Sequence, residues 1–205
     1  MKLFKKVSVI ETKRCFVLSQ RFTSKKMRKK GIKEYNPDKD TLIQNLSKTK
    51  KKVLKLREKS LDKIIGDEYK KRLKAYETLD WYLGEVNVSE VKVWNRTGGL
   101  YESWTQRVSL SQTAQKLRVE LKKDKSKIQK RRAFQVVPQI IPIKRILQKE
   151  KYLLPIVVPN GTYKKHNGGI KTISWFLDDG CMRSLAYAVS GDEKIKVYIG
   201  ILKSE

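Results

Sequence analysis

IKTISWFLDDGCMRSLAYAVSGDEKIKVYIGIL, residues 170–202, carries the clearest structural signal in the chain. It contains three runs of residues that favour β-strands, namely 170–177, 182–189 and 195–202. Residues 178–180 and 190–193 separate the runs, and both separators are rich in Asp, Gly and Ser, which favour turns. The stretch therefore predicts an antiparallel three-stranded β-meander.

Further strands are expected upstream of this meander. Alternating valines followed by Trp94 predict a half-buried strand over 86–94. Prolines punctuate the apolar runs 134–137 and 153–158, so we interpret both as edge strands or short extended segments, since proline cannot donate to a sheet ladder. The expected class is α+β, with the meander joined to a β-rich core and with long basic amphipathic helices in the N-terminal and middle regions.

Two segments have helical spacing. Between 39 and 84, apolar residues recur every three or four positions with Lys and Arg between them. A second helix is expected over about 109–132, starting at Ser109. We therefore divide the chain into a basic N-terminal arm or targeting segment (1–38), a basic amphipathic helical region (39–84) and a β-rich domain that contains the second helix (85–205).

The charge of the chain predicts its partner. It holds 48 Lys and Arg against 21 Asp and Glu, a formal net charge of +27 in 205 residues. Most of these cations have no anion within the chain, and phosphate backbones supply dense negative charge. Nucleic acid is the first candidate, RNA ahead of DNA, and an anionic membrane surface is the second. No stretch approaches the ~20 apolar residues of a membrane span.

Phosphate contacts are expected from cationic runs at 25–33, 48–57 and 116–132 and from the loop around 164–165. The candidate residues are Lys25, Lys26, Arg28, Lys29, Lys30, Lys50, Lys51, Lys52, Lys116, Arg118, Lys122, Lys123, Lys127, Lys130, Arg131, Arg132, Lys164 and Lys165. The expected function is non-enzymatic RNA binding, either in a ribonucleoprotein of ribosomal type or as a viral nucleic-acid-binding protein. Other ribonucleoprotein components, or a second copy of this chain, are the expected protein partners.

Residue types that usually carry catalysis or metal binding are scarce. Cys15 and Cys181 are the only cysteines and neither belongs to a CxxC pair, while His166 is the only histidine. We therefore assign no catalytic residue, no metal ligand and no cofactor. The cysteine usage favours a reducing intracellular compartment, which is the cytoplasm, the mitochondrion or a virus-infected host cell.

An enzyme is the alternative. Residues 175–180, Trp-Phe-Leu-Asp-Asp-Gly, resemble the Trp-Phe-Met-Asp-Asp-Gly form of a motif in LAGLIDADG homing endonucleases. The resemblance implies an acidic residue at the end of a helix that binds a divalent metal for DNA cleavage, with Asp178 or Asp179 as the ligand. Asp179-Gly180 is otherwise expected to be a hairpin turn. A third hypothesis is a peripheral membrane or self-associating interaction protein, in which the helix over 42–83 mediates self-association.

Overall fold

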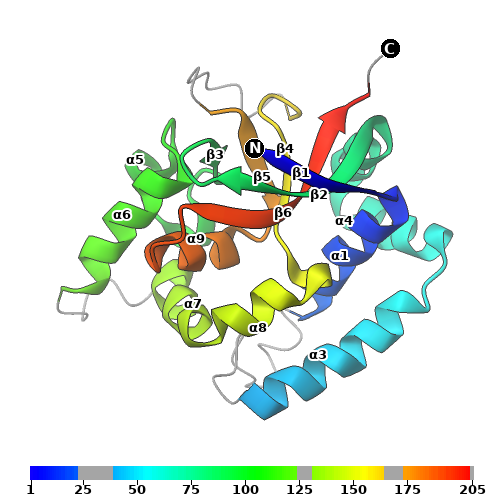
Figure 1. Cartoon of the computed structure of the whole chain (residues 1–205), viewed down its shortest axis with the longest axis horizontal. Helices are drawn as coiled ribbons and strands as arrows, with labels where there is room; N and C mark the ends of the chain where they lie inside the picture. Colours follow the sequence, from blue (N-terminus) through cyan, green and yellow to red (C-terminus); the bar gives the residue numbers. More distant parts are fainter. Residues whose placement is uncertain (23–38, 124–130, 164–172, 204–205) are drawn as a thin grey trace.

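The computed structural model describes residues 1–22, 39–123, 131–163 and 173–203 and has the predicted α+β class (Figure 1). The α-helices are α1 (Val9–Phe22), α3 (Lys39–Leu54), α4 (Glu58–Thr78), α5 (Glu102–Thr105), α6 (Leu110–Leu121), α7 (Arg132–Ile140), α8 (Lys144–Lys149) and α9 (Cys181–Val189). The strands are β1 (Lys2–Val7), β2 (Leu79–Asn87), β3 (Val91–Lys92), β4 (Ile156–Pro159), β5 (Trp175–Asp179) and β6 (Lys194–Leu202). Short 3₁₀ turns cover Thr97–Gly99, Ile141–Ile143 and Lys151–Leu153.

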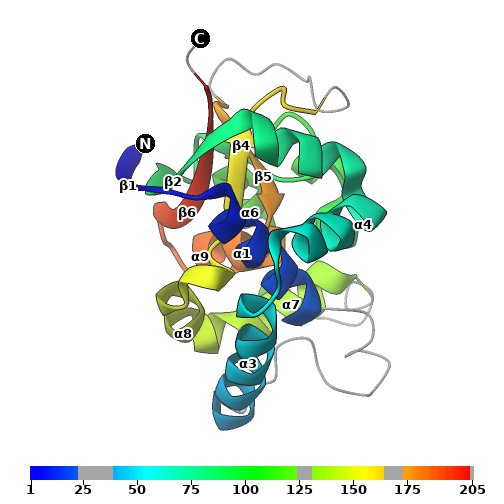
Figure 2. The ribbon, with the colours of Figure 1, turned by 90° about the vertical axis from the view of Figure 1, so that its right-hand side faces the viewer.

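The strands form one mixed sheet in the order β1-β2-β6-β4-β5-β3. Strands β2 and β6 pair antiparallel along nine residues, from Leu79 opposite Leu202 to Asn87 opposite Lys194. Strand β4 runs parallel to β6 and antiparallel to β5. Helices α1, α7, α8 and α9 lie together on one side of the sheet, and α3 crosses the far end of this helical layer (Figures 1 and 2).

The predicted meander is wrong in its middle element, because residues 181–189 form helix α9. Every side chain from Met182 to Val189 is buried, and a short apolar run buried on all sides looks the same in sequence whether it is a strand or a helix. Gly180 begins the helix with a left-handed φ of 86°, so Asp179-Gly180 is a strand-to-helix junction and not a hairpin turn. Strands β5 and β6 are consequently separated by β4.

The runs interrupted by proline also differ from the expectation. Strand β4 is an inner strand and not an edge strand. This position is possible because Pro155 and Pro159 lie at the two ends of the strand, where a missing N–H is tolerated. The carbonyl of Pro155 still accepts a hydrogen bond from the Tyr198 amide at 2.8 Å. Residues 134–137 are helical and belong to α7, whose buried residues recur at helical spacing: Ala133, Val136, Val137 and Ile140.

The remaining expected elements are found with shifted bounds. The strand predicted over 86–94 is divided: β2 begins earlier, at Leu79, and β3 covers Val91–Lys92 in parallel with β5. Helices α3 and α4 occupy most of 39–84, and α6 begins after Ser109, whose side chain accepts from the Gln112 amide in a capping box. The domain boundaries proposed at 38 and 84 stay predictions.

The N-terminal elements pack into the same core as the C-terminal strands. Strand β1 pairs antiparallel with β2, and the Cys15 thiol of α1 donates to the carbonyl of Leu154 at 3.3 Å. The buried ammonium of Lys13 lies 2.6 Å from Asp62 and 3.2 Å from Glu58, which fastens α1 to α4. No helix among the described residues is both long and apolar enough to cross a membrane.

Candidate nucleic-acid interface

The predicted cations of α3 divide into two kinds. Lys51 and Lys52 are exposed and form no ion pair with any described residue. Lys50 instead lies 2.8 Å from a carboxylate oxygen of Glu150, beside the ring of Tyr152. Lys51 and Lys52 are therefore available to an external anion, whereas Lys50 is engaged within the protein.

Helix α6 uses most of its predicted cations for internal contacts. Arg118 donates from Nε and Nη2 to the carbonyls of Val189 and Ala188, at 2.8 and 3.0 Å, at the C-terminal end of α9. The Ala188 carbonyl also accepts from the Gly191 amide at 3.0 Å, and the guanidinium adds a side-chain cap to this end of the helix. Lys116 donates to the carbonyl of Ser103, and Lys123 pairs with Glu120 at 2.7 Å. Lys122, at the end of the helix, is exposed.

Arg131 and Arg132 lie at the start of α7. The Arg131 guanidinium donates to the carbonyl of Gly99 and lies 3.8 Å from the centre of the Tyr101 ring. Arg132 is exposed. The other predicted phosphate contacts lie outside the described residues: Lys25, Lys26, Arg28, Lys29, Lys30, Lys127, Lys130, Lys164 and Lys165.

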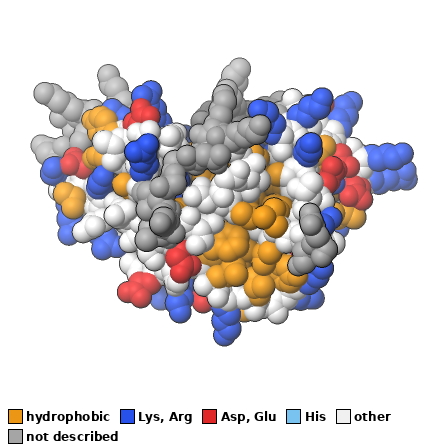
Figure 3. Space-filling view, turned by 90° about the horizontal axis from the view of Figure 1, so that it is seen from above, with side chains coloured by type: hydrophobic (Ala, Val, Ile, Leu, Met, Phe, Trp, Pro, Cys, Tyr) orange, Lys and Arg blue, Asp and Glu red, His pale blue; other side chains and the backbone are white. Residues whose placement is uncertain are grey.

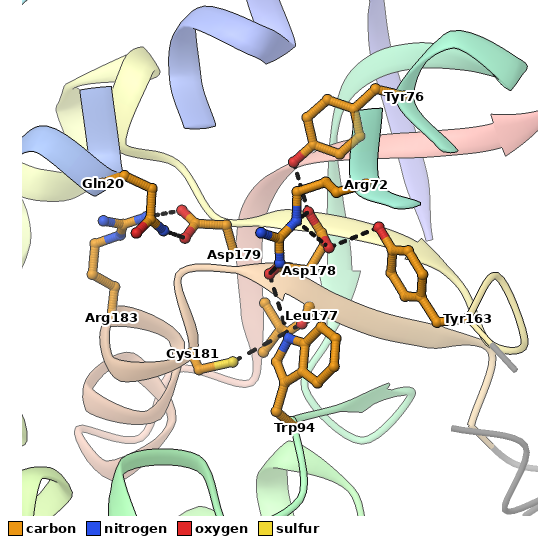
Figure 4. A network of polar contacts seen from close by, with 10 residues as sticks. All are labelled: Gln20, Arg72, Tyr76, Trp94, Tyr163, Leu177, Asp178, Asp179, Cys181 and Arg183. Carbon is orange, nitrogen blue, oxygen red and sulfur yellow. Dashed lines mark hydrogen bonds and ion pairs between the residues drawn. The ribbon is translucent and has the colours of Figure 1, made fainter. Parts of the chain in front are cut away.

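The Asp178 carboxylate lies at the centre of a buried polar network (Figure 4). It accepts hydrogen bonds from Arg72 Nε at 2.8 Å, from the Tyr76 hydroxyl at 2.6 Å and from the Tyr163 hydroxyl at 2.9 Å. Arg72 also donates from Nη2 to the backbone carbonyl of Asp178. The network joins α4, β5 and the segment after β4, so its evident effect is to hold these three parts together.

Asp179 points to the other side of β5 and has partners of its own (Figure 4). Arg183 Nη2 lies 2.9 Å from Asp179 Oδ2, and Gln20 donates to Oδ1 at 3.0 Å. Arg183 also donates to the Ser19 hydroxyl at 2.9 Å. Asp179 therefore fixes the relative positions of α1 and α9.

The protonation of the Asp178 network follows from its burial. Burial raises the pKa of the Tyr76 and Tyr163 hydroxyls, and the nearby Asp178 charge raises both further. Burial alone would lower the pKa of Arg72, but the Asp178 carboxylate outweighs it and raises that pKa. The network therefore holds one cation and one anion between two neutral phenols.

This geometry corrects what the endonuclease resemblance implied about local structure. Asp178 and Asp179 lie in strand β5 and not at the end of a helix. Each carboxylate is already neutralised by a guanidinium, which opposes the binding of a divalent cation there. Within the described ranges, no three His, Cys, Asp or Glu side chains gather as a metal site would require. The arrangement supports an architectural role for both aspartates.

A polar groove lies between α8 and β6 and has a cavity volume of about 570 Å³. Its lining residues are Glu85, Lys144, Arg145, Gln148, Lys149, Asp192, Lys194 and Lys196, and these define what we call the α8–β6 groove. Five of them are cationic and two are acidic. The lining contains no aromatic or aliphatic residue, so its chemistry is that of an anion site.

One acid of the groove is held by α8. Lys144 and Gln148 are four residues apart on the helix, and they contact the two carboxylate oxygens of Asp192 at 2.8 and 2.9 Å. These contacts fix α8 against the turn that precedes β6. Arg145, Lys149, Lys194 and Lys196 are exposed and form no ion pair with a described residue.

The sequence analysis missed all five groove cations, because it looked for dense cationic runs. Two weaker signals mark them. Lys194 and Lys196 are two apart in a strand, and Arg145 and Lys149 are four apart in a helix, so each pair shares one face. That α8 and β6 lie next to one another is not visible in the sequence.

The comparisons with known proteins give no relative for this arrangement. No family matches the chain, and neither a curated protein nor a solved structure matches it significantly.

Proposed function

We propose that this chain binds nucleic acid through phosphate contacts, RNA in preference to DNA, and catalyses no reaction. The observation that supports the proposal best is how the charges are divided. Several acids are paired with cations of the chain itself: Asp178 and Asp179 each face a buried guanidinium, and Glu58, Asp62 and Glu77 share the single ammonium of Lys13. The excess of cations is left for the surface.

The exposed cations are spread over several elements. They include Lys51 and Lys52 on α3, Arg145 and Lys149 on α8, and Lys194 and Lys196 on β6. On the face seen in Figure 3, Lys and Arg lie around the rim, whereas hydrophobic side chains gather nearer the centre. Such a distribution suits contacts with an extended polyanion, because one phosphate backbone can reach several separated cations.

The proposed setting is based on composition and cysteine usage. Both cysteines are free thiols, which supports a reducing compartment such as the cytoplasm or the mitochondrion. A small, strongly basic protein of this kind suits a ribonucleoprotein of ribosomal type or the packaging of a viral nucleic acid. The preference for RNA rests on this composition, and the binding experiment decides it.

The test is binding of the purified full chain to fluorescent single-stranded RNA, duplex RNA and duplex DNA across a salt series, with and without Mg²⁺. We expect the logarithm of affinity to fall linearly with the logarithm of salt concentration, at about 0.7 to 0.9 per phosphate contacted. The products are then run on a gel, where intact nucleic acid is expected. Absence of binding at low salt would overturn the proposal, and Mg²⁺-dependent cleavage lost in Asp179→Asn would replace it with a nuclease.

A further inference from the structure

We propose that the α8–β6 groove is the principal site at which this chain holds the phosphodiester backbone of a nucleic acid. This inference rests on the proposed function and names the surface that performs it. The predicted cationic runs do not include this surface. It is assembled from two elements that are far apart in the sequence, α8 (Lys144–Lys149) and β6 (Lys194–Leu202).

The cations of α8 divide into two rows with different tasks. Lys144 and Gln148 form the row that holds Asp192. Arg145 and Lys149, each one position further along the helix, form the adjacent row, and both are exposed in the groove. Because Lys144 and Gln148 fix the helix against Asp192, Arg145 and Lys149 are positioned at the groove although neither forms an ion pair with a described residue.

Strand β6 supplies the opposite wall. Lys194 and Lys196 are exposed while Ile195 and Val197 are buried, so the two lysines project from the same face of the strand. In this part of β6, Lys194 and Lys196 are paired with Asn87 and Glu85 of β2, and the pairing with β4 begins further along the strand, at Tyr198. Two cations from a helix therefore face two cations from an inner strand across one cavity.

The acids of the groove do not cancel this charge. Asp192 is occupied by Lys144 and Gln148. Glu85 lies opposite Lys196 in the β2–β6 register, but forms no ion pair with any described residue. Among the residues that line the groove, Glu85 is therefore the acid that is not otherwise paired. Four crowded cations repel one another, and an entering polyanion relieves that repulsion.

The lining chemistry selects the class of ligand. Recognition of bases in single strands depends on aromatic platforms, and the groove has none, so it binds the backbone without reading sequence. Insertion into a lipid surface needs exposed apolar side chains, and none lines the groove. Lysine and arginine around a cavity of about 570 Å³ fit phosphates of a nucleic-acid strand.

The decisive experiment compares two variants of the full chain that lose the same charge. The groove variant combines Arg145→Gln, Lys149→Gln, Lys194→Gln and Lys196→Gln. The control variant combines Lys59→Gln, Lys63→Gln, Lys70→Gln and Lys74→Gln, four exposed α4 lysines that have no ion pair with any residue in the described ranges. All eight side chains are exposed, so both variants are expected to fold, which circular dichroism and thermal unfolding verify.

Affinity for single-stranded RNA, duplex RNA and duplex DNA is measured for each protein across the same salt series. The groove variant should lose roughly tenfold or more in affinity at about 150 mM salt, and its salt slope should fall by about 3 to 3.5, since four phosphate contacts are lost and each contributes about 0.7 to 0.9. The control should stay within about threefold of the unaltered chain. Equal losses in the two variants would overturn the inference while leaving the proposed function intact.

A gain-of-function variant gives a second, independent readout. Glu85→Gln removes the acid of the groove that has no ion pair, so it should raise affinity by about two- to threefold at low salt and steepen the salt dependence. Unchanged or weaker binding would count against the groove. Flotation with vesicles of anionic lipid completes the test, because groove-dependent flotation in the absence of RNA binding would overturn both the inference and the proposed function.

Discussion

Arg72 and Asp178 are separated by 106 positions in the sequence, yet Arg72 Nε lies 2.8 Å from the Asp178 carboxylate in the interior of the protein. The pair connects helix α4 to strand β5. Tyr76 and Tyr163 donate two further hydrogen bonds to the carboxylate. If one partner of a buried ion pair is removed, the other charge stays buried without a counter-charge, which destabilises the folded state.

Replacing Asp178 by Asn should therefore destabilise the fold strongly. The change keeps the size of the side chain but leaves the Arg72 guanidinium buried without a counter-charge, which costs about 3–5 kcal/mol in the free energy of unfolding. Urea denaturation measures this loss. The matched control is Glu102→Gln, which breaks the exposed Arg96–Glu102 pair and should cost no more than about 1 kcal/mol. Similar losses for the two variants would contradict the assigned role of Asp178.

Stability should fall at alkaline pH because of the buried tyrosines. The pKa values of Tyr76, Tyr163 and Tyr198 are raised in the folded state, chiefly by burial. In the unfolded chain they ionise near pH 10, so the unfolded state loses protons that the folded state keeps. The contribution of these tyrosines to the free energy of unfolding is complete below about pH 10 and is lost as the pH rises further.

The measurement is phenolate absorbance against pH, compared with unfolding followed by circular dichroism. Part of the phenolate signal should appear only together with unfolding. In Tyr76→Phe, the free energy of unfolding should depend less steeply on pH above about 10. If all the tyrosines titrated while the protein was still folded, the buried network would be refuted.

Two glycine substitutions should act in opposite directions. A Cβ at Gly84 would lie 2.5 Å from the carbonyl oxygen of Lys2 and 2.6 Å from Ile199 Cδ1, so Gly84→Ala pushes on β1 and should cost about 1–3 kcal/mol. A Cβ at Gly66, within α4, meets only Leu73 Cδ2, at 3.5 Å. Gly66→Ala should therefore stabilise the protein by about 0.5–1 kcal/mol through helix propensity. Thermal unfolding of both variants checks the signs, and a stabilising Gly84→Ala would exclude the described β1–β2 packing.

Lys92 is a buried cation on β3, only 2% exposed, and forms no ion pair with a described residue. Burial lowers its pKa, and the nearby Arg107 lowers it further. Lys92→Met should therefore raise the free energy of unfolding at pH 7, because no charge is then desolvated. The gain should shrink as the pH approaches 10.5, where the unfolded lysine is also losing its proton. Chemical denaturation at pH 7 and pH 10 tests this, and a destabilised variant would show that the charge is needed.

Helices α3, α4 and α6 could be predicted because residues close together in the sequence mark them. Ser109 and Gln112 mark the beginning of α6, and the apolar spacing after residue 39 marks α3 and α4. The prediction failed at 182–189, because this run is buried on every side and its period is therefore uninformative. The prediction of an edge strand at 153–158 failed because prolines that lie at the ends of a strand cannot be told, from composition, from prolines that interrupt one.

The candidate site depended on features that a single sequence does not contain. Asp178 and Asp179 attracted attention as a motif, but Arg72, which neutralises Asp178, lies 106 positions away in the chain. Arg118 looks like one more cation in a basic run, and only its contacts with Val189 and Ala188 show that it caps a helix. The groove cations are separated in the same way, because a fold is needed to place α8 beside β6.

The position of β6 in the sheet also determines the order in which the sheet can be completed. This strand follows all the others in the sequence, yet it lies between β2 and β4. A chain that emerges from the ribosome therefore carries two separate sheet fragments, β1–β2 and β4–β5–β3, until residues 194–202 are available to join them. The sheet closes only once β6 has been made, and its β2–β6 contacts span more than a hundred residues, which slows folding.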